Sequence, residues 1–277
     1  MSISEAATRR AGETGALVLV TRPEPRIGLL TLNRPEARNS LSLGLMTALQ
    51  AEIETLGADR GISAIVVAAA GPAFSAGHDL KEMTAHRKDS DGGRAFYAET
   101  MRACAALMQK IVACPKPVIA AVHATATAAG CQLVATCDLA VAAETAKFCT
   151  PGVNIGLFCS TPMVALSRNV SRKRAMEMLL LGEMISAKDA VEYGLVNRVV
   201  AAERVLEEAL ALARQIAVKS PVTVAIGKAA FYKQIELPLS EAYDYAAGVM
   251  VENMMVADAE EGIGAFIDKR KPEWKGC

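Results

Sequence analysis

The sequence predicts an α/β fold in which helices cover a parallel sheet, followed by a helical C-terminal region. Short β-branched runs alternate with helical patterns through the N-terminal half. The run IVVAAA at 65–70 is apolar throughout, which is typical of a strand that is buried on both faces. The chain after Thr161-Pro162 is almost wholly helical in pattern. With 277 residues, 52% of them hydrophobic, the chain can bury a sizeable core as one globular domain.

In the N-terminal half, five runs are predicted as strands, and helices lie between several of them. Ser42 is the predicted N-cap of a helix that continues to about Leu56, where Gly57 ends it. Its apolar residues recur at four-residue spacing, as in an amphipathic helix. The five predicted strands are Leu17–Thr21, Ile27–Asn33, Ile62–Ala69, Val118–His123 and Asp138–Ala142.

In the C-terminal half, helix starts are predicted at three polar residues. Thr161, followed by Pro162, is a typical N-cap and first helical residue, and Ser171 and Ser186 are predicted to cap the next two helices. A last strand covers Leu195–Val200. Helices then follow from Glu203 to Ala217, from Pro221 onward and from Leu239 to Ile267. The final segment is more apolar than one exposed helix should be, which fits a subunit contact, a substrate wall or an ordinary core helix.

Charge and composition exclude several classes of function. Thirty Lys and Arg balance thirty Asp and Glu, so no overall field attracts the chain to nucleic acid or to an anionic membrane. No run of about 18 uncharged apolar residues is present. The seven cysteines lack the closely spaced pairs of a zinc or redox site, so we expect no metal and a reducing compartment. Because residues 1–15 contain no secretory h-region, we predict a cytoplasmic protein, with the mitochondrial matrix as the alternative.

Common catalytic motifs are missing from the sequence. It contains no G-x-G-x-x-G after a strand, no G-K-[ST] phosphate loop and no H-E-x-x-H. The segment Phe74-Ser-Ala-Gly77 has Ala73 where a nucleophile elbow needs its first glycine, which disfavours Ser75 as a nucleophile. Rossmann redox, nucleotide hydrolysis and zincin chemistry are therefore excluded.

Two stretches of small residues each follow a predicted buried strand. Residues 71–82 lead through Ala and Gly into a short polar helix, and residues 118–133 lead through seven small residues into another helix. Each stretch leaves backbone N–H groups free at a helix start, the second near Ala129, where they can stabilise a negatively charged oxygen. One such stretch alone is more often a tight turn, but two together favour an oxyanion hole.

Four motifs occur in an order that resembles the crotonase, or enoyl-CoA hydratase/isomerase, superfamily. They are LNRPEARNSL at 32–41, FSAGHDLKEM at 74–83, PKPVIAAV at 115–122 and CDLA at 137–140, and residues 187–199 add a fifth matching segment. The resemblance covers about residues 15–275. It implies a spiral of ββα turns with a C-terminal helical trimerisation region, and a homotrimer or a dimer of trimers. We therefore divide the chain into a flexible N-terminus (1–15), a crotonase spiral core (16–200) and a helical oligomerisation region (201–277).

The resemblance also implies a coenzyme A thioester as substrate, with no separate cofactor. The backbone N–H groups of His78 and Ala129 would hold the thioester carbonyl oxygen. The chain is electrically neutral, so the phosphates need local cations, and Arg38, Lys81 and Lys269 are suitable. The family's remaining contacts to adenine and pantetheine fall on Ala37, Ala76, Asp79 and Leu80, and Phe266 belongs to the segment that closes over the nucleotide.

The sequence departs from the hydratase pattern at both catalytic acids. Gln132 and Gly152 stand where the family's hydratases have Glu, and neither can transfer a proton near neutral pH. Gly152 is also expected to resist a side chain through a left-handed backbone. Asn154 is the first candidate to orient a water in place of these acids, while His123 is more often a satisfied core residue.

Two functions from different classes follow from this departure. The first is an acyl-CoA-dependent enzyme of fatty-acid or related metabolism, of lyase or isomerase class by resemblance, in which ordinary hydration is in doubt. Decarboxylation or thioester hydrolysis suits such a site better, because both depend on stabilising a charged oxygen. The second is a non-catalytic acyl-CoA binder that keeps the pocket.

Overall fold

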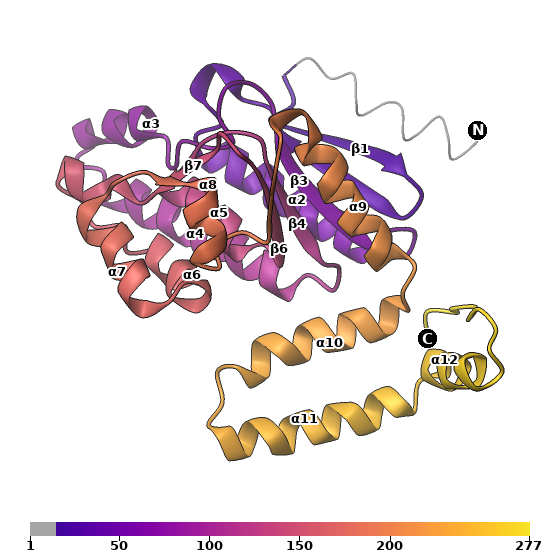
Figure 1. The fold of residues 1–277 in the computed structure, drawn as a ribbon. Helices are drawn as coiled ribbons and strands as arrows, with labels where there is room; N and C mark the ends of the chain where they lie inside the picture. Colours follow the sequence, from indigo (N-terminus) through magenta and orange to yellow (C-terminus); the bar gives the residue numbers. More distant parts are fainter. Residues whose placement is uncertain (1–14) are drawn as a thin grey trace.

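The centre of the molecule is a six-stranded sheet with the order β1-β2-β3-β4-β6-β9 (Figure 1). This computed structural model describes residues 15–277, so the predicted flexible N-terminus lies outside the described residues except for Gly15. β1 pairs antiparallel with β2, and the other neighbouring strands are parallel. The strands are β1 (Val18–Glu24), β2 (Ile27–Leu32), β3 (Ala64–Ala69), β4 (Val118–Val122), β6 (Leu139–Ala143) and β9 (Arg198–Val200). The predicted α/β class is confirmed.

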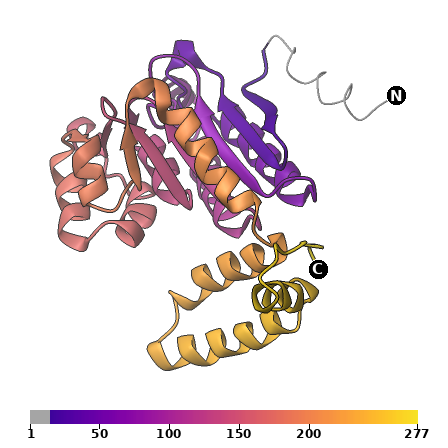
Figure 2. The same ribbon diagram turned by 45° about the vertical axis from the view of Figure 1, so that its right-hand side comes forward.

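Helices cover both faces of this sheet, which explains the apolar strands. α9 (Val205–Ala217) lies across β2, β3, β4 and β6 in front of the sheet, and α2 (Leu43–Ala58) lies behind it (Figures 1 and 2). α4 (Arg94–Ala113) packs beside α2. Ser42 caps α2 as predicted, since its hydroxyl accepts the Leu45 N–H at 3.2 Å. β4 is buried along its whole length.

A second, three-stranded sheet escaped prediction. It has the order β5-β7-β8 and consists of β5 (Ala126–Thr127), β7 (Lys147–Cys149) and β8 (Ile185–Ser186). Strands of two or three residues are too short to show an alternating pattern. This sheet lies next to the site described below, because β5 leads directly into α5 (Ala129–Thr136).

The helix starts agree only in part with prediction. Ser186 forms a capping box with Asp189 at α8 (Ala187–Glu192), as expected. Thr161 makes no side-chain cap at α6 (Pro162–Asn169), because its own backbone is already helical, with φ −76° and ψ −42°. Ser171 precedes α7 (Arg172–Leu181) and also makes no side-chain cap. Both residues mark the helix start correctly, but the predicted caps are wrong.

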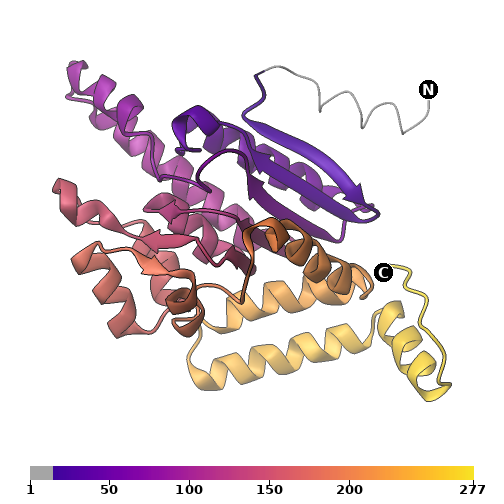
Figure 3. The same cartoon turned by 45° about the horizontal axis from the view of Figure 1, so that its top comes forward.

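The C-terminal region forms an arm that leaves the sheet (Figures 1 and 3). It consists of α10 (Pro221–Gln234), α11 (Leu239–Met254) and α12 (Ala257–Ile267). The helical segment predicted over 239–267 is broken at Met255–Val256, where Val256 is extended. This break lets the buried Asp258 carboxylate accept the Ser220 hydroxyl at 2.7 Å. This hydrogen bond joins the start of α12 to the residue that caps α10.

One part-buried polar cluster attaches the arm to the core. Lys228 on α10 forms a 2.6 Å ion pair with Asp138 and also donates to the carbonyls of Ile111 and Lys116 at 2.9 and 3.1 Å. The Tyr232 hydroxyl donates to the other oxygen of Asp138 at 2.9 Å. α10 and α11 contain no buried residue. Large apolar side chains are instead exposed along the arm: Leu239, Tyr243, Met250, Val251, Met254, Met255, Phe266 and Ile267.

Neither a membrane span nor a metal site is evident between residues 15 and 277. No single helix there is long and apolar enough to cross a bilayer, and only residues 202–217 and 221–234, bent by 107°, meet the criteria as a pair. The same residues contain no group of three or more His, Cys, Asp or Glu side chains that could hold a metal ion.

Candidate active site

The two stretches of small residues lie side by side at the carboxyl ends of β3 and β4. The N–H groups of Phe74 and Ser75 donate to the Thr125 carbonyl at 3.0 and 3.3 Å, and the Thr127 N–H donates to the Ser75 carbonyl at 2.9 Å. A side chain at Gly130 would come within 2.4 Å of the Ser75 carbonyl oxygen. Glycine is therefore required for α5 to approach the loop so closely.

Ser75 has a structural role in this loop. Its side chain is fully buried, and its hydroxyl donates to the Asn39 carbonyl at 2.9 Å. A nucleophile needs access to substrate and a neighbouring base. The position of Ser75 agrees with the expectation that it is not a nucleophile.

The backbone of His78 presents a free N–H group. Leu41 bridges the residues on either side: its N–H donates to the Gly77 carbonyl at 2.7 Å, and its carbonyl accepts the Asp79 N–H at 3.4 Å. In a parallel bridge of this kind the intervening N–H points away from the partner. The His78 N–H accordingly has no acceptor among residues 15–277.

Ala129 supplies a second free N–H group beside the first. It is the first residue of α5, and its N–H has no acceptor in the described part of the chain, whereas the Ala128 N–H donates to the Cys149 carbonyl at 2.9 Å. A Cβ built on Gly77, which has φ +88°, would lie 3.4 Å from the Ala129 nitrogen. Two free N–H groups thus meet at a helix N-terminus, an arrangement that can stabilise a developing oxyanion.

Gln132 and Gly152, where the resemblance leads one to expect the two hydratase glutamates, are both closely packed. Gln132, one turn into α5, is buried, and its Oε1 accepts from the Cys104 thiol at 3.6 Å. A Cβ on Gly152 would lie 2.9 Å from both Cys159 Sγ and the Leu157 carbonyl oxygen. Gly152 does not have the left-handed backbone expected from the sequence. The close approach of residues 157 and 159 is the actual obstacle to a side chain there.

Neither candidate replacement for the two acids is hydrogen-bonded to the two donors. Asn154 is exposed, and its amide donates to the Gly182 carbonyl at 3.4 Å. No hydrogen bond among residues 15–277 joins it to His78 or Ala129. His123 bonds through Nε2 to the Gly71 carbonyl at 2.8 Å, which fits the structural interpretation.

Three buried thiols lie near these positions and are protonated at neutral pH. Burial raises the pKa of Cys131, Cys149 and Cys159, in the case of Cys149 to about 11, with a smaller contribution from mutual repulsion for the first two. Because the thiolate is the reactive form, none of the three is an activated nucleophile.

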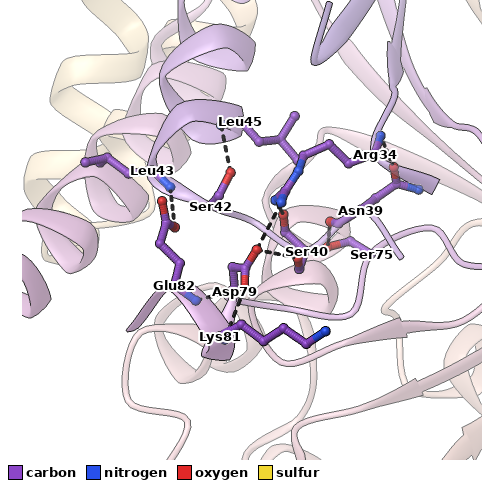
Figure 4. A network of polar contacts seen from close by, with 10 residues as sticks. All are labelled: Arg34, Asn39, Ser40, Ser42, Leu43, Leu45, Ser75, Asp79, Lys81 and Glu82. Atoms are coloured by element: carbon purple, nitrogen blue, oxygen red, sulfur yellow. Dashed lines mark hydrogen bonds and ion pairs between the residues drawn. The ribbon is translucent and has the colours of Figure 1, made fainter. Parts of the chain in front are cut away.

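A polar network fixes the segment that carries His78 (Figure 4). One carboxylate oxygen of Asp79 accepts from Arg34 at 3.1 Å and from the Ser40 hydroxyl at 3.2 Å. The other oxygen caps α3 (Leu80–Ala85) through the N–H groups of Lys81 and Glu82 at 3.1 and 3.2 Å. Although burial opposes ionisation, the Glu82 N–H, Arg34 and Ser40 together lower the pKa of Asp79. The side chain of Asp79, predicted as a ligand contact, is therefore occupied within the protein.

Backbone hydrogen bonds hold the segments that carry three further predicted ligand contacts, Ala37, Arg38 and Ala76. The Arg38 carbonyl accepts the Ala76 N–H at 3.0 Å, and the Ala37 carbonyl accepts the Ser40 N–H at 3.0 Å. Arg38 is itself exposed and left-handed, with φ 50°. Asn39 is completely buried and donates to the carbonyls of Ala70 and Ala73 at 2.7 and 2.9 Å. Sequence reasoning assigned no role to Arg34 or Asn39, although both lie in the first quoted motif.

An open groove runs along α3 and contains two of the predicted contacts. Leu80 and Lys81 line it together with Thr84, Ala85 and Lys88. Lys88 was missed by the sequence reasoning, because a single lysine in a polar segment is usually only a solvated surface charge. The two lysines make this groove a suitable place for anionic phosphates.

Phe266 and Lys269 lie far from the other predicted contacts in the same chain. Phe266 lies in the last turn of α12 and Lys269 two residues after its end. α3 and α12 occupy opposite ends of the molecule (Figures 1 and 3). Phe266 is 85% exposed. One copy of the chain therefore cannot bring them to its own groove.

Known proteins resemble this chain over most of its length. The family model described as enoyl-CoA hydratase/isomerase matches residues 23–277. The chain is 46% identical over 272 residues to enoyl-CoA hydratase domain-containing protein 3, mitochondrial, of Rattus norvegicus, covering 98% of this chain and 89% of that protein. A crystal structure of enoyl-CoA hydratase from Mycobacterium smegmatis is similar with a TM-score of 0.88 and 51% identity, covering 93% of this chain and 98% of that one. The crystal structure of the human enoyl-CoA hydratase domain-containing protein 3 gives 0.87 and 45%, covering 93% and 100%.

Proposed function

Because this chain belongs to the enoyl-CoA hydratase/isomerase family and has its crotonase fold, we propose that it binds an acyl-CoA thioester and stabilises negative charge on the thioester oxygen. The thioester oxygen accepts hydrogen bonds from the N–H groups of His78 and Ala129. The observation that carries this proposal is their juxtaposition: both groups lack an acceptor among residues 15–277, and Gly77 packs against the start of α5.

The coenzyme A part of the ligand lies along the first motif and α3. Arg38 and Lys81, joined by Lys88, supply local positive charge for its phosphates. Lys269 and Phe266 complete this site from a neighbouring copy, since they lie at the opposite end of their own chain. The exposed apolar side chains of α11 and α12 support a homotrimer or a dimer of trimers.

The reaction that fits these residues is one that passes through a charged oxygen without a pair of carboxylates. In decarboxylation of a 2-carboxyacyl thioester, the bond from the α-carbon to the carboxylate breaks, carbon dioxide leaves, and the electron pair enters the enolate. Water then protonates the α-carbon and becomes hydroxide. In thioester hydrolysis, water adds to the carbonyl carbon and coenzyme A leaves as the thiol. The two N–H groups stabilise the oxyanion in both cases, and Gln132 and Gly152 make ordinary hydration a poor fit.

A second function, non-catalytic acyl-CoA binding, is supported by the packing of the two lost acids. Gln132 accepts a hydrogen bond from Cys104, and residues 157 and 159 leave no room for a side chain at position 152. The nearby thiols of Cys131 and Cys149 are protonated at neutral pH. A binder keeps the donors and needs no proton transfer.

Calorimetry with coenzyme A and butyryl-CoA, together with mass spectrometry of an acyl-CoA panel, tests these functions. We expect binding of both ligands, with crotonyl-CoA hydrated slowly or not detectably, because each missing acid or base typically contributes ~10²- to 10⁴-fold. Turnover of any panel member favours the enzyme, and binding without turnover favours the binder. Hydration of crotonyl-CoA at an ordinary enzymatic rate, by protein free of host hydratase, would contradict the proposed chemistry.

The proposed phosphate site has its own matched test. Arg38→Glu should weaken coenzyme A binding roughly 10-fold or more, because a charge-assisted contact is replaced by repulsion. Arg60→Glu makes the same charge change at an exposed position beyond α2 and should leave the affinity unchanged. Equal affinity in both variants would remove Arg38 from the site.

A further inference from the structure

Three side chains on elements that adjoin the donor pair have buried polar atoms without a hydrogen-bond partner. They are His78, through both ring nitrogens, Tyr97, through its hydroxyl, and Thr100, through Oγ1. Thr100 is 99% buried. Buried polar groups are nearly always hydrogen-bonded, because an unpaired one loses its hydration without compensation. Three such groups on neighbouring elements need an explanation.

The topology places the two hydroxyl groups on the side of α4 that faces the donors. α4 and α5 each connect one parallel strand to the next, so both helices run against the strands and therefore parallel to each other. The hydrogen bond from the Cys104 thiol to Gln132 shows which turn of α4 lies beside which turn of α5. Thr100 is four residues before Cys104, and Ala129 is three residues before Gln132, so each lies about one turn back. Thr100 is thus level with Ala129.

Tyr97 lies about one turn before Thr100, nearer the N-terminus of α4. Its ring packs over Gly93, where an added Cβ would come within 2.8 Å of both the Tyr97 hydroxyl and the His86 carbonyl oxygen. The hydroxyl itself makes no hydrogen bond with any described residue. Thr100 and Tyr97 therefore place two unpaired hydroxyl groups along α4, one at the level of the donor pair and one nearer the helix N-terminus.

His78 adds a third polar group from the other side. Its backbone N–H is one of the two proposed donors, so its imidazole is attached at the hole itself. Burial lowers the pKa of His78, which favours the neutral ring at pH 7. The Leu41 backbone lies near enough to oppose this shift in part, but it does not reach hydrogen-bond geometry with either ring nitrogen. All three groups are then uncharged, and each can both donate and accept a hydrogen bond.

We infer that the acyl group bound here carries an oxygen substituent, which His78, Tyr97 and Thr100 hydrogen-bond. This inference rests on the proposed function, because it assumes that an acyl-CoA thioester occupies the donor pair. A plain hydrocarbon chain would leave all three groups unpaired in the complex. An oxygenated acyl group pairs them, and its oxygen belongs either to a hydroxyl group or to a carboxylate.

The test compares ligands of one chain length by calorimetry. The probes are butyryl-CoA, 3-hydroxybutyryl-CoA, 4-hydroxybutyryl-CoA and succinyl-CoA, which distinguish hydroxyl from carboxylate and near from distal oxygen. We expect at least one oxygenated probe to bind roughly 2- to 12-fold more tightly than butyryl-CoA for each hydrogen bond gained. Equal or weaker binding of all three oxygenated probes overturns the inference while leaving the proposed function intact. Failure of every probe, including butyryl-CoA, overturns the proposed function and the inference together.

Two isosteric variants locate the effect. Tyr97→Phe and Thr100→Val should reduce the preference for the oxygenated probe toward one, without weakening butyryl-CoA. Thr55→Val is the matched control, because Thr55 is exposed on α2 and its hydroxyl bonds within that helix. A preference unchanged in both test variants overturns the inference. Without ligand, Thr100→Val should keep or raise the Tm, since it removes an unpaired hydroxyl; a marked fall would show a structural role instead and also overturn it.

Discussion

Replacing Ala129 with proline removes one of the two proposed oxyanion donors, but it also works against the ψ of −119° at Ala128, because the proline ring favours a ψ of about +120° to +160° in the residue before it. Ala129 is the first residue of α5, a position where proline is common, and its N–H has no acceptor among residues 15–277. The helix therefore loses no hydrogen bond. The side chain at this position is fully buried, however, so the added ring atoms cost about 1–3 kcal/mol of stability through overpacking.

The expected effect differs between binding and catalysis. A hydrogen bond to the neutral thioester carbonyl contributes about 0.5–1.5 kcal/mol, so acyl-CoA affinity should fall roughly 2- to 12-fold. Coenzyme A without an acyl group has no carbonyl at the hole, and its affinity should not change. In the transition state the oxygen carries a charge, and loss of one donor then costs about 2.7–4 kcal/mol, or ~10²–10³ in kcat.

Calorimetry of butyryl-CoA and coenzyme A on parent and variant measures this difference directly. Arg172→Pro is the matched control, because it introduces proline at the first residue of α7 on an exposed position. The control should leave both affinities unchanged. If folded Ala129→Pro protein keeps the parent's ratio of butyryl-CoA to coenzyme A affinity, then Ala129 does not hold the thioester, and the proposed oxyanion hole is wrong.

Three further predictions concern the framework of the site. Gly152→Glu should lower the Tm, because a Cβ at this position would lie 2.9 Å from a carbonyl oxygen and a sulfur. Adding this change to Gln132→Glu should therefore restore little hydration, and a rate well above that of the Gln132→Glu variant would contradict this. Lys228→Met should cost about 3–5 kcal/mol in chemical denaturation by leaving Asp138 without its buried cation, and a loss below ~1 kcal/mol would refute that role. The lowered pKa of Asp79 means that its contribution is present above the unfolded pKa of about 3.9 and is lost as pH falls through the folded value. The Tm difference between parent and Asp79→Asn should therefore be full above about pH 5 and shrink in acid; a constant difference would argue against the network.

Local signals in the sequence were sufficient for the main elements. Ser42 marks the start of α2, and the apolar run of β3 identifies a strand covered on both faces. The two stretches of small residues also pointed to the donor segments. These features depend on a residue and its near neighbours, so they can be read without knowing the fold. The family motifs extended that reading to His78 and Ala129.

Other features depend on residues that are distant in the sequence. The carboxylate of Asp79 could serve a ligand as well as its own protein, and only the approach of Arg34 and Ser40 decides between them. Gly152 was expected to be left-handed, but its constraint comes from residues 157 and 159 folding over it. β5, β7 and β8 exist only because three short segments meet.

The sequence by itself determined the fold class and the order of the large elements. The tertiary structure alone decided which N–H groups remain free, which polar side chains lack partners, and that α12 lies far from α3 in its own chain. The physical reason is that the folding pattern of an element is set by local side-chain periodicity and capping. Satisfaction of a hydrogen bond instead depends on every atom that packing brings within about 3 Å.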